Sequence, residues 1–419
     1  PAWEETRPPR PACVWGLVRV SSPRMRPVPI SDPPNHFCRF RAHRVIRVSR
    51  PPVARDFCSP DFGLLRASPR CDADRLQRVD VTEAMNLPKV VLHDHLDGGL
   101  RPATVLELAA QRGLPMLAQT PEDLATWFFE SADSGSLARY LDTFTETVGL
   151  MQDADSLRRI AREFVVDMAT DGVIYAEARW APQQHLTGGL SAAAATEAVQ
   201  AGLVDGMESA SRSGTTIIAR QILCLMRHLD VPEDVVDLAV NHAPGVVGVD
   251  IAGPEDGFPL TPVTNALTRI QAAGIHLTVH AGEAAGPESV LDALNHGAER
   301  LGHGVRIIED RDESEWGPIA QRVLSNQVPL EVCPTSNTQT GICRKVAEHP
   351  LSTLWSAGFN ITVSCDNRLM SRTTTSREIS LVSQALSWNR DDALAVQRNA
   401  LQAAFCSQDD KQSLVPLLV

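Results

Sequence analysis

The chain has 419 residues, of which 43% are hydrophobic, and a formal net charge of −12 at pH 7. No run approaches 18 consecutive apolar residues, so the sequence predicts no membrane span. The negative charge argues against nucleic acid as a partner, because neutralising phosphates requires clustered Lys and Arg. Nine cysteines without a CxxC pair are typical of reduced thiols, which predicts a cytoplasmic protein.

The first 80 residues differ from the rest of the chain. They contain 13 prolines, 15 arginines, no lysine and 8 acidic residues, a local charge of +7, whereas residues 81–419 carry −19. Such a segment cannot bury enough apolar surface to offset its ordering entropy. We therefore expect residues 1–80 to be a disordered Pro/Arg-rich extension; its acids and prolines argue against a targeting helix. The alternative is that this segment lies upstream of a working protein that begins near Met85.

From residue 89 onward, short β-branched runs alternate with longer helical segments. The predicted strands are Lys89–His95, Val173–Arg179, Thr216–Leu223, Val246–Ile251, Ile275–His280, Arg300–His303, Val328–Val332 and Asn360–Ser364. The predicted helices include Thr104–Gln111, Ser136–Leu150, Ser156–Thr170, Ala192–Ser211, Thr261–Ala273, Glu288–His296 and Glu315–Ser325. Strands separated by helix-length segments form parallel βαβ units. Eight of them predict an α/β fold, a closed (β/α)8 TIM barrel with extra helices over residues 86–419. An open doubly wound sheet is the alternative, but no GxGxxG follows the first strand.

Polar residues of a metal-binding type stand at the ends of these strands. His93 and His95 close the first strand and point to the same side, since side chains alternate along a strand. Alone, this pair fits core packing as well as a metal site. His280 and His303 end two other strands, and further polar or glycine positions follow strands: Gly253, Glu283 and Asp366. Active sites of such barrels lie at the carboxyl ends of the strands, so we expect these residues to meet at one rim and form a metal hydrolase site.

Six motifs occur in a fixed order. They are LPKVVLHDHLDGG at residues 87–99, DIAG at 250–253, HAGE at 280–283, LGHG at 301–304, EVCPTSN at 331–337 and SCDN at 364–367. This series resembles the adenosine deaminases, zinc enzymes of the amidohydrolase superfamily. The resemblance covers residues 86 to about 410, nearly the whole predicted barrel.

The resemblance implies a single zinc site. His93, His95, His280 and Asp366 would bind the ion and leave one position for water. Zinc lowers the pKa of that water from 15.7 towards about 7, and the hydroxide would attack C6 of a purine. His303 would orient the hydroxide or take its proton, while Asp366 would also accept a hydrogen bond.

The same resemblance implies how a purine nucleoside would be held. Glu283 would donate a proton to N1, so that negative charge does not accumulate on the ring. The Gly253 N–H would contact N3, Asp97 the ribose hydroxyls and Asn367 the N7 atom, with His95 also facing the substrate. The expected partners are this small nucleoside and water, not nucleic acid or a membrane.

The chain departs from the common family pattern after the last predicted strand. Many members have Asp-Asp-Pro where this chain has Asp366-Asn367-Arg368, and Thr where it has Cys365. An Asn amide donates to N7 without a proton shift, so we expect function to survive. We expect Cys365 to be a packing residue, because Asp366 fills the ligand role.

Two other features bear on the site. The three lysines, at 89, 345 and 411, lie away from the fourth predicted strand, which disfavours the two-metal relatives that carry a carboxylated lysine there. The remaining histidines match no family site, and we expect them to be structural or surface residues; they include His185, His228, His276 and His349.

Three functions remain to be distinguished: deamination of adenosine and 2′-deoxyadenosine, deamination of another purine such as free adenine, and non-catalytic purine binding. Asp97 favours the nucleoside, because adenine-type relatives tend to carry Glu there. The complete set of predicted catalytic residues argues against a binding module. Ser136–Met151 has apolar residues at helical spacing; we hypothesise that it covers the site mouth, the alternative being an ordinary outer helix.

Overall fold

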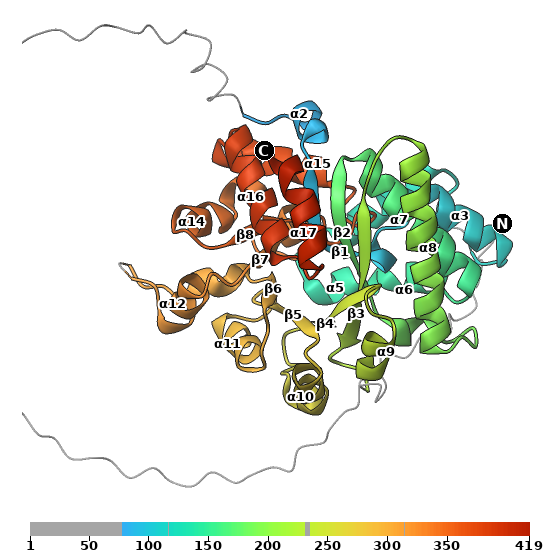
Figure 1. Ribbon diagram of the computed structural model, residues 1–419, viewed down its shortest axis with the longest axis horizontal. Coiled ribbons are helices and arrows are strands. Elements are labelled where there is room, and N and C mark those ends of the chain that lie inside the picture. Colours follow the sequence, from blue (N-terminus) through green and yellow to red (C-terminus); the bar gives the residue numbers. More distant parts are fainter. Residues whose placement is uncertain (1–77, 116, 231–234, 314) are drawn as a thin grey trace, which may run out of the picture. The chain divides into compact units, whose positions relative to one another are not determined.

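Eight parallel strands form one barrel, with helices around it (Figure 1). The computed structural model describes residues 78–115, 117–230, 235–313 and 315–419. The predicted disordered extension therefore lies, up to residue 77, outside the described residues. The strands run in the order of the sequence: β1 (Lys89–His95), β2 (Val173–Trp180), β3 (Ile218–Met226), β4 (Val246–Ala252), β5 (His276–Ala281), β6 (Arg300–His303), β7 (Leu330–Val332) and β8 (Ile361–Val363).

Backbone hydrogen bonds beyond the end of β8 close the barrel. The His95 N–H donates to the Asp366 carbonyl over 2.8 Å, and the Asp366 N–H donates to the His93 carbonyl over 3.0 Å. Asp94 and Asp366 thereby form a parallel bridge between β1 and the segment after β8. The prediction of a (β/α)8 TIM barrel is confirmed, and the open doubly wound alternative is wrong.

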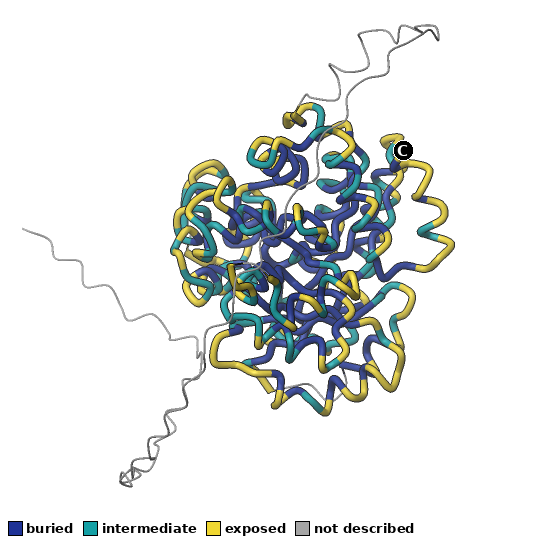
Figure 2. Tube along the Cα trace, turned by 90° about the vertical axis from the view of Figure 1, so that its left-hand side faces the viewer, coloured by how far each residue is buried: buried dark blue, intermediate teal, exposed yellow. Residues whose placement is uncertain are grey.

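Helices surround the strands and cover their outer faces. Their bounds are α2 (Val81–Asn86), α3 (Pro102–Gln111), α4 (Pro121–Ala132), α5 (Leu137–Asp142), α6 (Phe144–Val148), α7 (Ala154–Thr170), α8 (Ala192–Arg212), α9 (Val235–Asn241), α10 (Thr264–Ala272), α11 (Pro287–Asn295), α12 (Pro318–Ser325), α13 (Pro334–Gln339), α14 (Leu351–Ser356), α15 (Thr375–Leu386), α16 (Arg390–Ala403) and α17 (Gln408–Leu414). Figure 2 shows buried residues concentrated along the strands and on the inner sides of the helices. Strands covered on both faces are expected in a parallel sheet.

The helix predicted over Ser136–Leu150 is in fact two short helices, α5 and α6. The Thr143 hydroxyl, at the junction, donates to the Tyr140 carbonyl over 2.7 Å. Such local side-chain bonds compete with the helical ladder, which the apolar spacing alone does not reveal. Among the described residues, no helix is both long and apolar enough to cross a membrane.

Lys89 ties the amino-terminal end of the barrel to α2. Its Nζ atom donates to the Ala84 carbonyl over 2.6 Å and to the Leu87 carbonyl over 2.7 Å. Both carbonyls lie at the C-terminal end of α2, where the Ala84 carbonyl also accepts from the Leu87 N–H over 3.2 Å. Burial lowers the pKa of the Lys89 ammonium to about 8. Lys89 therefore stabilises the amino-terminal end of the barrel, away from the predicted site.

Candidate metal and catalytic site

The four predicted metal ligands converge at the carboxyl ends of β1, β5 and β8. His93 Nε2 and His95 Nε2 lie 3.3 and 3.4 Å from Asp366 Oδ1. His95 Nε2 lies 3.2 Å from His280 Nε2. Atoms bound about 2.0–2.1 Å from one tetrahedral ion are roughly 3.3 Å apart. The spacing of these four side chains therefore fits a single metal ion.

Two carboxylates orient the histidines that face this centre. Glu331 Oε2 lies 2.9 Å from His93 Nδ1, and Asp250 Oδ1 lies 3.1 Å from His280 Nδ1. Each carboxylate holds a proton on Nδ1 and leaves the Nε2 lone pair for a metal. Within the described part of the chain, His93 Nε2 is buried without a hydrogen-bond partner. A buried acceptor without a donor suits a cation, so the residues present fit the implied metal.

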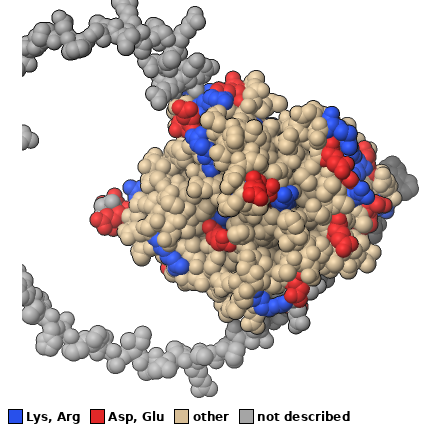
Figure 3. Space-filling model, viewed as in Figure 1, with Lys and Arg blue, Asp and Glu red and all other residues tan. Residues whose placement is uncertain are grey.

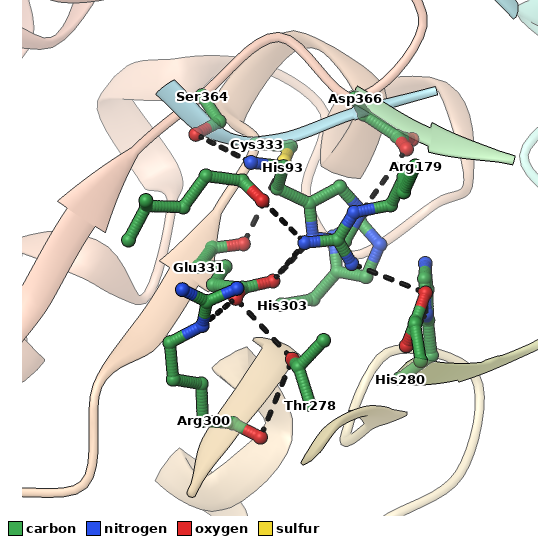
Figure 4. Close-up of polar contacts among 12 residues, drawn as sticks. His93, Arg179, Thr278, His280, Arg300, His303, Glu331, Cys333, Ser364 and Asp366 are labelled. Atoms are coloured by element: carbon green, nitrogen blue, oxygen red, sulfur yellow. Dashed lines mark hydrogen bonds and ion pairs between the residues drawn. The ribbon is translucent and has the colours of Figure 1, made fainter. Parts of the chain in front are cut away.

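Arg179 connects the two carboxylates beneath the histidines. Its guanidinium lies 3.2 Å from Asp250 Oδ2 and 2.7 Å from Glu331 Oε2. Figure 4 shows Glu331 between Arg179 and Arg300, close to the imidazole of His93. Burial opposes ionisation of Glu331, but the two arginines hold its pKa well below the usual range. The Glu331 carboxylate is therefore ionised and can accept a hydrogen bond from the His93 Nδ1–H group.

His303 also reaches the metal centre, so a second ligand set is possible by distance. His93, His280, His303 and Asp366 each offer one ligand atom within 4.8 Å of the others. His303 Nε2 lies 3.4 Å from Glu283 Oε2.

His303 and Asp366 both have left-handed backbone conformations, with φ of 60° and 63°. Such strain in non-glycine residues is typical of functional sites, where the surrounding structure holds it in place.

Glu283, predicted to donate the proton, is buried in the turn after β5. Its Oε1 accepts a hydrogen bond from the Thr340 hydroxyl over 3.0 Å. Burial raises the pKa of the Glu283 carboxyl well above its usual range, and the negative charges of Asp366 and Glu255 raise it further. Glu283 is therefore suited to hold a proton near neutral pH.

The turn that carries Glu283 is anchored by Glu255, which the sequence analysis missed. The Glu255 carboxylate accepts four backbone N–H bonds, from residues 282 to 285, at 2.6 to 3.0 Å. Its place two residues after the DIAG motif was the only available signal. Glu255 both fixes the turn and supplies a charge that, in addition to burial and Asp366, raises the pKa of Glu283.

Asp97, predicted to bind ribose, lies in a buried 3₁₀ turn directly after β1. Its Oδ2 is 3.7 Å from Nε2 of His185. Within the described residues, Asp97 Oδ1 and His185 Nε2 are buried without hydrogen-bond partners. Asp97 therefore retains acceptor capacity for hydroxyl donors, and His185, expected to be merely structural, stands behind it.

The other two predicted substrate contacts flank the same centre. Gly253 follows β4 with φ of 94°, a conformation that favours glycine. Asn367 is buried against Gly98, where a Cβ atom would lie only 1.8 Å from Asn367 Oδ1. Glycine at position 98 is thus required by the neighbouring amide rather than by its own backbone. Cys365 is buried and faces Thr375, as expected for a packing residue.

The segment Ser136–Met151 lies over the site. The Phe144 ring centroid is 6.3 Å from that of His95. Tyr140 is buried, and its hydroxyl lies 3.5 Å from Ser371 Oγ, after β8. A cavity of about 490 Å³ between this segment and the barrel is lined by Leu137 and Glu283, among others. The placement agrees with a covering segment rather than an outer barrel helix.

Comparisons with known proteins agree with the motifs. The family model described as adenosine deaminase matches residues 88–418. The chain is 46% identical over 336 residues to adenosine deaminase 1 of Streptomyces coelicolor, covering 78% of this chain and 85% of that protein. It is 45% identical to adenosine deaminase of Mycolicibacterium gilvum, covering 78% and 93%.

Solved structures share the fold over most of the chain. An amidohydrolase from Burkholderia ambifaria with bound zinc has a TM-score of 0.70 and 26% identity, covering 81% of this chain and 91% of that one. Adenine deaminase from Arthrobacter aurescens has a TM-score of 0.69 at 24% identity, covering 79% and 98%, which shows the fold alone. With the family model spanning the barrel and relatives at 45–46% identity, the chain belongs to the adenosine deaminase family.

Proposed function

We propose that this chain catalyses the zinc-dependent hydrolytic deamination of adenosine and 2′-deoxyadenosine to inosine and 2′-deoxyinosine, with release of ammonia. The observation that carries the proposal is the buried cluster of His93, His95, His280 and Asp366 beside Glu283, in a member of the adenosine deaminase family. Residues 86–419 would form the single catalytic domain.

Zinc is the proposed metal because three imidazoles and one carboxylate are ligands that it favours. The relative from Burkholderia ambifaria holds zinc, which supports this choice. When bound, the ion supplies Lewis-acid activation of water at neutral pH. Glu331 and Asp250 would keep the His93 and His280 lone pairs directed at the ion.

The residues around the centre divide the remaining tasks. Glu283 would pass its proton to purine N1 as C6 becomes tetrahedral, which prevents charge from accumulating on the ring. Asp366 would accept a hydrogen bond from the attacking water, and His303 would hold that water in place. The substrate would be oriented by His95, Asp97, Gly253 and Asn367, with the Gly253 N–H at N3 and the Asn367 amide at N7.

Adenosine is preferred to free adenine because of Asp97. Its Oδ1 is a buried acceptor without a protein donor in the described region. A buried carboxylate oxygen without a partner is costly, and a ribose hydroxyl would satisfy it. Free adenine has no such hydroxyl.

The proposed partners are a small purine nucleoside and water. The face seen in Figure 3 carries acidic and basic side chains in small separate groups, without the continuous basic surface that nucleic acid requires. The described cysteines are all free, as expected in a reducing compartment, and we place the enzyme in the cytoplasm.

The decisive experiment follows adenosine absorbance with the purified full chain, before and after chelation and after zinc is restored. Conversion to inosine that is lost on chelation and recovered with zinc is the expected result. Absence of metal-dependent conversion would overturn the proposal. Adenine, tested in parallel, distinguishes a nucleoside enzyme from a free-base enzyme.

Phe144 would form an apolar wall that excludes water from the purine. In Phe144→Ala, the KM for adenosine should rise much more than the free energy of unfolding falls, because the ring lies at the site mouth beside His95. The measurements are steady-state kinetics and denaturant unfolding. An unchanged KM would contradict the covering role.

A further inference from the structure

His303 is supported by two buried residues to which the proposed mechanism gives no role. Asn337 Nδ2 lies 3.1 Å from His303 Nδ1, and His349 Nε2 lies 3.1 Å from Asn337 Oδ1. The exposed fractions of the three residues are 1%, 0% and 2%. Asn337 belongs to α13 and His349 precedes α14, so this chain of contacts links both helices to the end of β6.

His349, at the end of this series of contacts, fixes which groups donate and which accept in its hydrogen bonds. The Leu351 backbone N–H donates to His349 Nδ1 over 2.9 Å, so that nitrogen carries no proton. Burial lowers the pKa of His349 to about 4, and the ring is neutral at pH 7. A neutral imidazole holds its proton on the other nitrogen, so His349 Nε2 must donate to Asn337 Oδ1.

The orientation of the Asn337 amide determines which ring nitrogen of His303 carries the proton. With its oxygen accepting from His349, the amide turns its NH2 group toward His303 Nδ1, which must accept. In neutral His303 the proton therefore lies on Nε2, the atom that faces Glu283 across 3.4 Å. An Nε2–H group can donate a hydrogen bond, but it has no lone pair for a metal or for a further proton.

We propose that His349 and Asn337 are positioning residues that hold His303 in the Nε2–H tautomer, so that His303 donates a hydrogen bond to the attacking oxygen instead of removing its proton. The identity of that oxygen rests on the proposed function, whereas the tautomer does not. The same assignment excludes His303 as a ligand through Nε2. It therefore selects His95 as the fourth ligand where distances alone allow either histidine.

The direct test is the tautomer of His303 in the zinc-loaded full chain. Nitrogen NMR of protein labelled with ¹⁵N-histidine distinguishes protonated from unprotonated ring nitrogens, and loss of one signal set in His303→Gln identifies the residue. We expect an unprotonated Nδ1 and a protonated Nε2. A protonated Nδ1 would overturn the inference. Because no substrate is needed, this result is independent of whether adenosine is turned over.

A reversed hydrogen bond gives the second test. In Asn337→Asp a carboxylate oxygen, which only accepts, faces His303 Nδ1, so the proton should move to Nδ1. The kcat should fall about 10- to 100-fold, with KM changed by less than about threefold. Asn337 Nδ2 also lies 3.5 Å from Glu283 Oε1, so the NMR signal, not kcat alone, reports the tautomer. An unchanged His303 signal would contradict the proposed control.

Variants of His349 separate positioning from packing. His349→Gln keeps an N–H donor for Asn337 and should retain kcat within about threefold, whereas His349→Leu loses the donor and should lower kcat about tenfold. His276→Gln, a replacement at an exposed histidine paired with Glu299, is the matched control and should leave kcat unchanged. Equal kcat in the Gln and Leu variants, with equal unfolding temperatures, would overturn the role. If His349→Leu does not fold, the wild-type spectrum and Asn337→Asp decide the question.

Discussion

The interior of the barrel pairs its buried charges with opposite charges, whereas its rim contains buried acceptors without hydrogen-bond donors among the residues that the structure describes. In the interior, Arg300 pairs with Glu177 over 2.6 Å and with Glu331 over 2.7 Å, so each charge has a close counter-charge. At the rim, His93 Nε2 and Asp97 Oδ1 are buried without hydrogen-bond partners in the described residues. Stability alone would favour pairing these groups.

This difference shows how the two layers share the work. In the proposed mechanism, the paired interior holds the histidine rings in one orientation, and the acceptors at the rim bind the metal and the substrate. Barrel interiors are commonly filled by branched apolar side chains. A charged layer directly below the site therefore indicates that it serves the site rather than packing alone. Substitutions in each layer should accordingly separate loss of chemistry from loss of stability.

The largest expected effect on kcat comes from a substitution at the rim that leaves the interior unchanged. Glu283→Gln keeps the shape of the side chain but removes the acidic proton, so kcat should fall by about 10²- to 10⁴-fold. The zinc content should be unchanged, because the four proposed ligands remain. Steady-state kinetics and metal analysis measure the two quantities. Retained turnover would remove Glu283 from the mechanism.

The next effect breaks the interior beneath the rim. Arg179→Met leaves Glu331 and Asp250 without their shared counter-charge. The free energy of unfolding should fall by about 3–5 kcal/mol, and zinc affinity by about 10- to 100-fold. Denaturant unfolding and chelator competition are the measurements. Arg158→Met, which breaks an exposed pair with Asp205, is the control and should leave the free energy of unfolding nearly unchanged. Equal zinc affinity in both variants would show that the charged layer does not support the ligands.

Glu255→Gln sharpens the electrostatic part of the comparison. The Glu255 charge adds to burial in raising the pKa of Glu283, whose protonated form is the active one in the proposed mechanism. Without that charge, Glu283 should lose its proton at lower pH, so the alkaline limb of the kcat/KM profile should move to lower pH. The pH profile in the two proteins is the measurement. A limb that stays in place would limit Glu255 to its backbone hydrogen bonds.

The smallest effect on catalysis is expected at the amino-terminal end of the barrel, on the side away from the site. Lys89→Met removes donors to the Ala84 and Leu87 carbonyls and should lower the free energy of unfolding by about 1–3 kcal/mol, with kcat unchanged. The pKa of Lys89 falls from 10.5 unfolded to about 8 folded. The unfolded state thus binds more protons between these values, and the wild type should gain stability over the variant as pH rises from 8 to 10.5. A pH-independent difference would contradict a buried, destabilised charge.

The barrel was predictable because its signals are local. Hydrophobic runs identified every strand to within a few residues, and the placement of polar residues at strand ends identified the rim. The supporting contacts were not predictable in this way. Glu255 acts on the backbone of a turn nearly thirty residues later, and His349 acts on His303 through Asn337. Neither relation leaves a periodic trace in the sequence, because each arises only when separate strands and helices pack together.

The contact between Gly98 and Asn367 sets a limit on redesign. Any side chain at position 98 would occupy the space of the Asn367 amide, which lies 1.8 Å from the place of a Cβ atom. Attempts to alter purine selectivity by enlarging residue 98 would therefore displace the group proposed to face N7. Residues 98 and 367 are therefore sterically coupled, and a change of purine selectivity at either position requires substitutions at both.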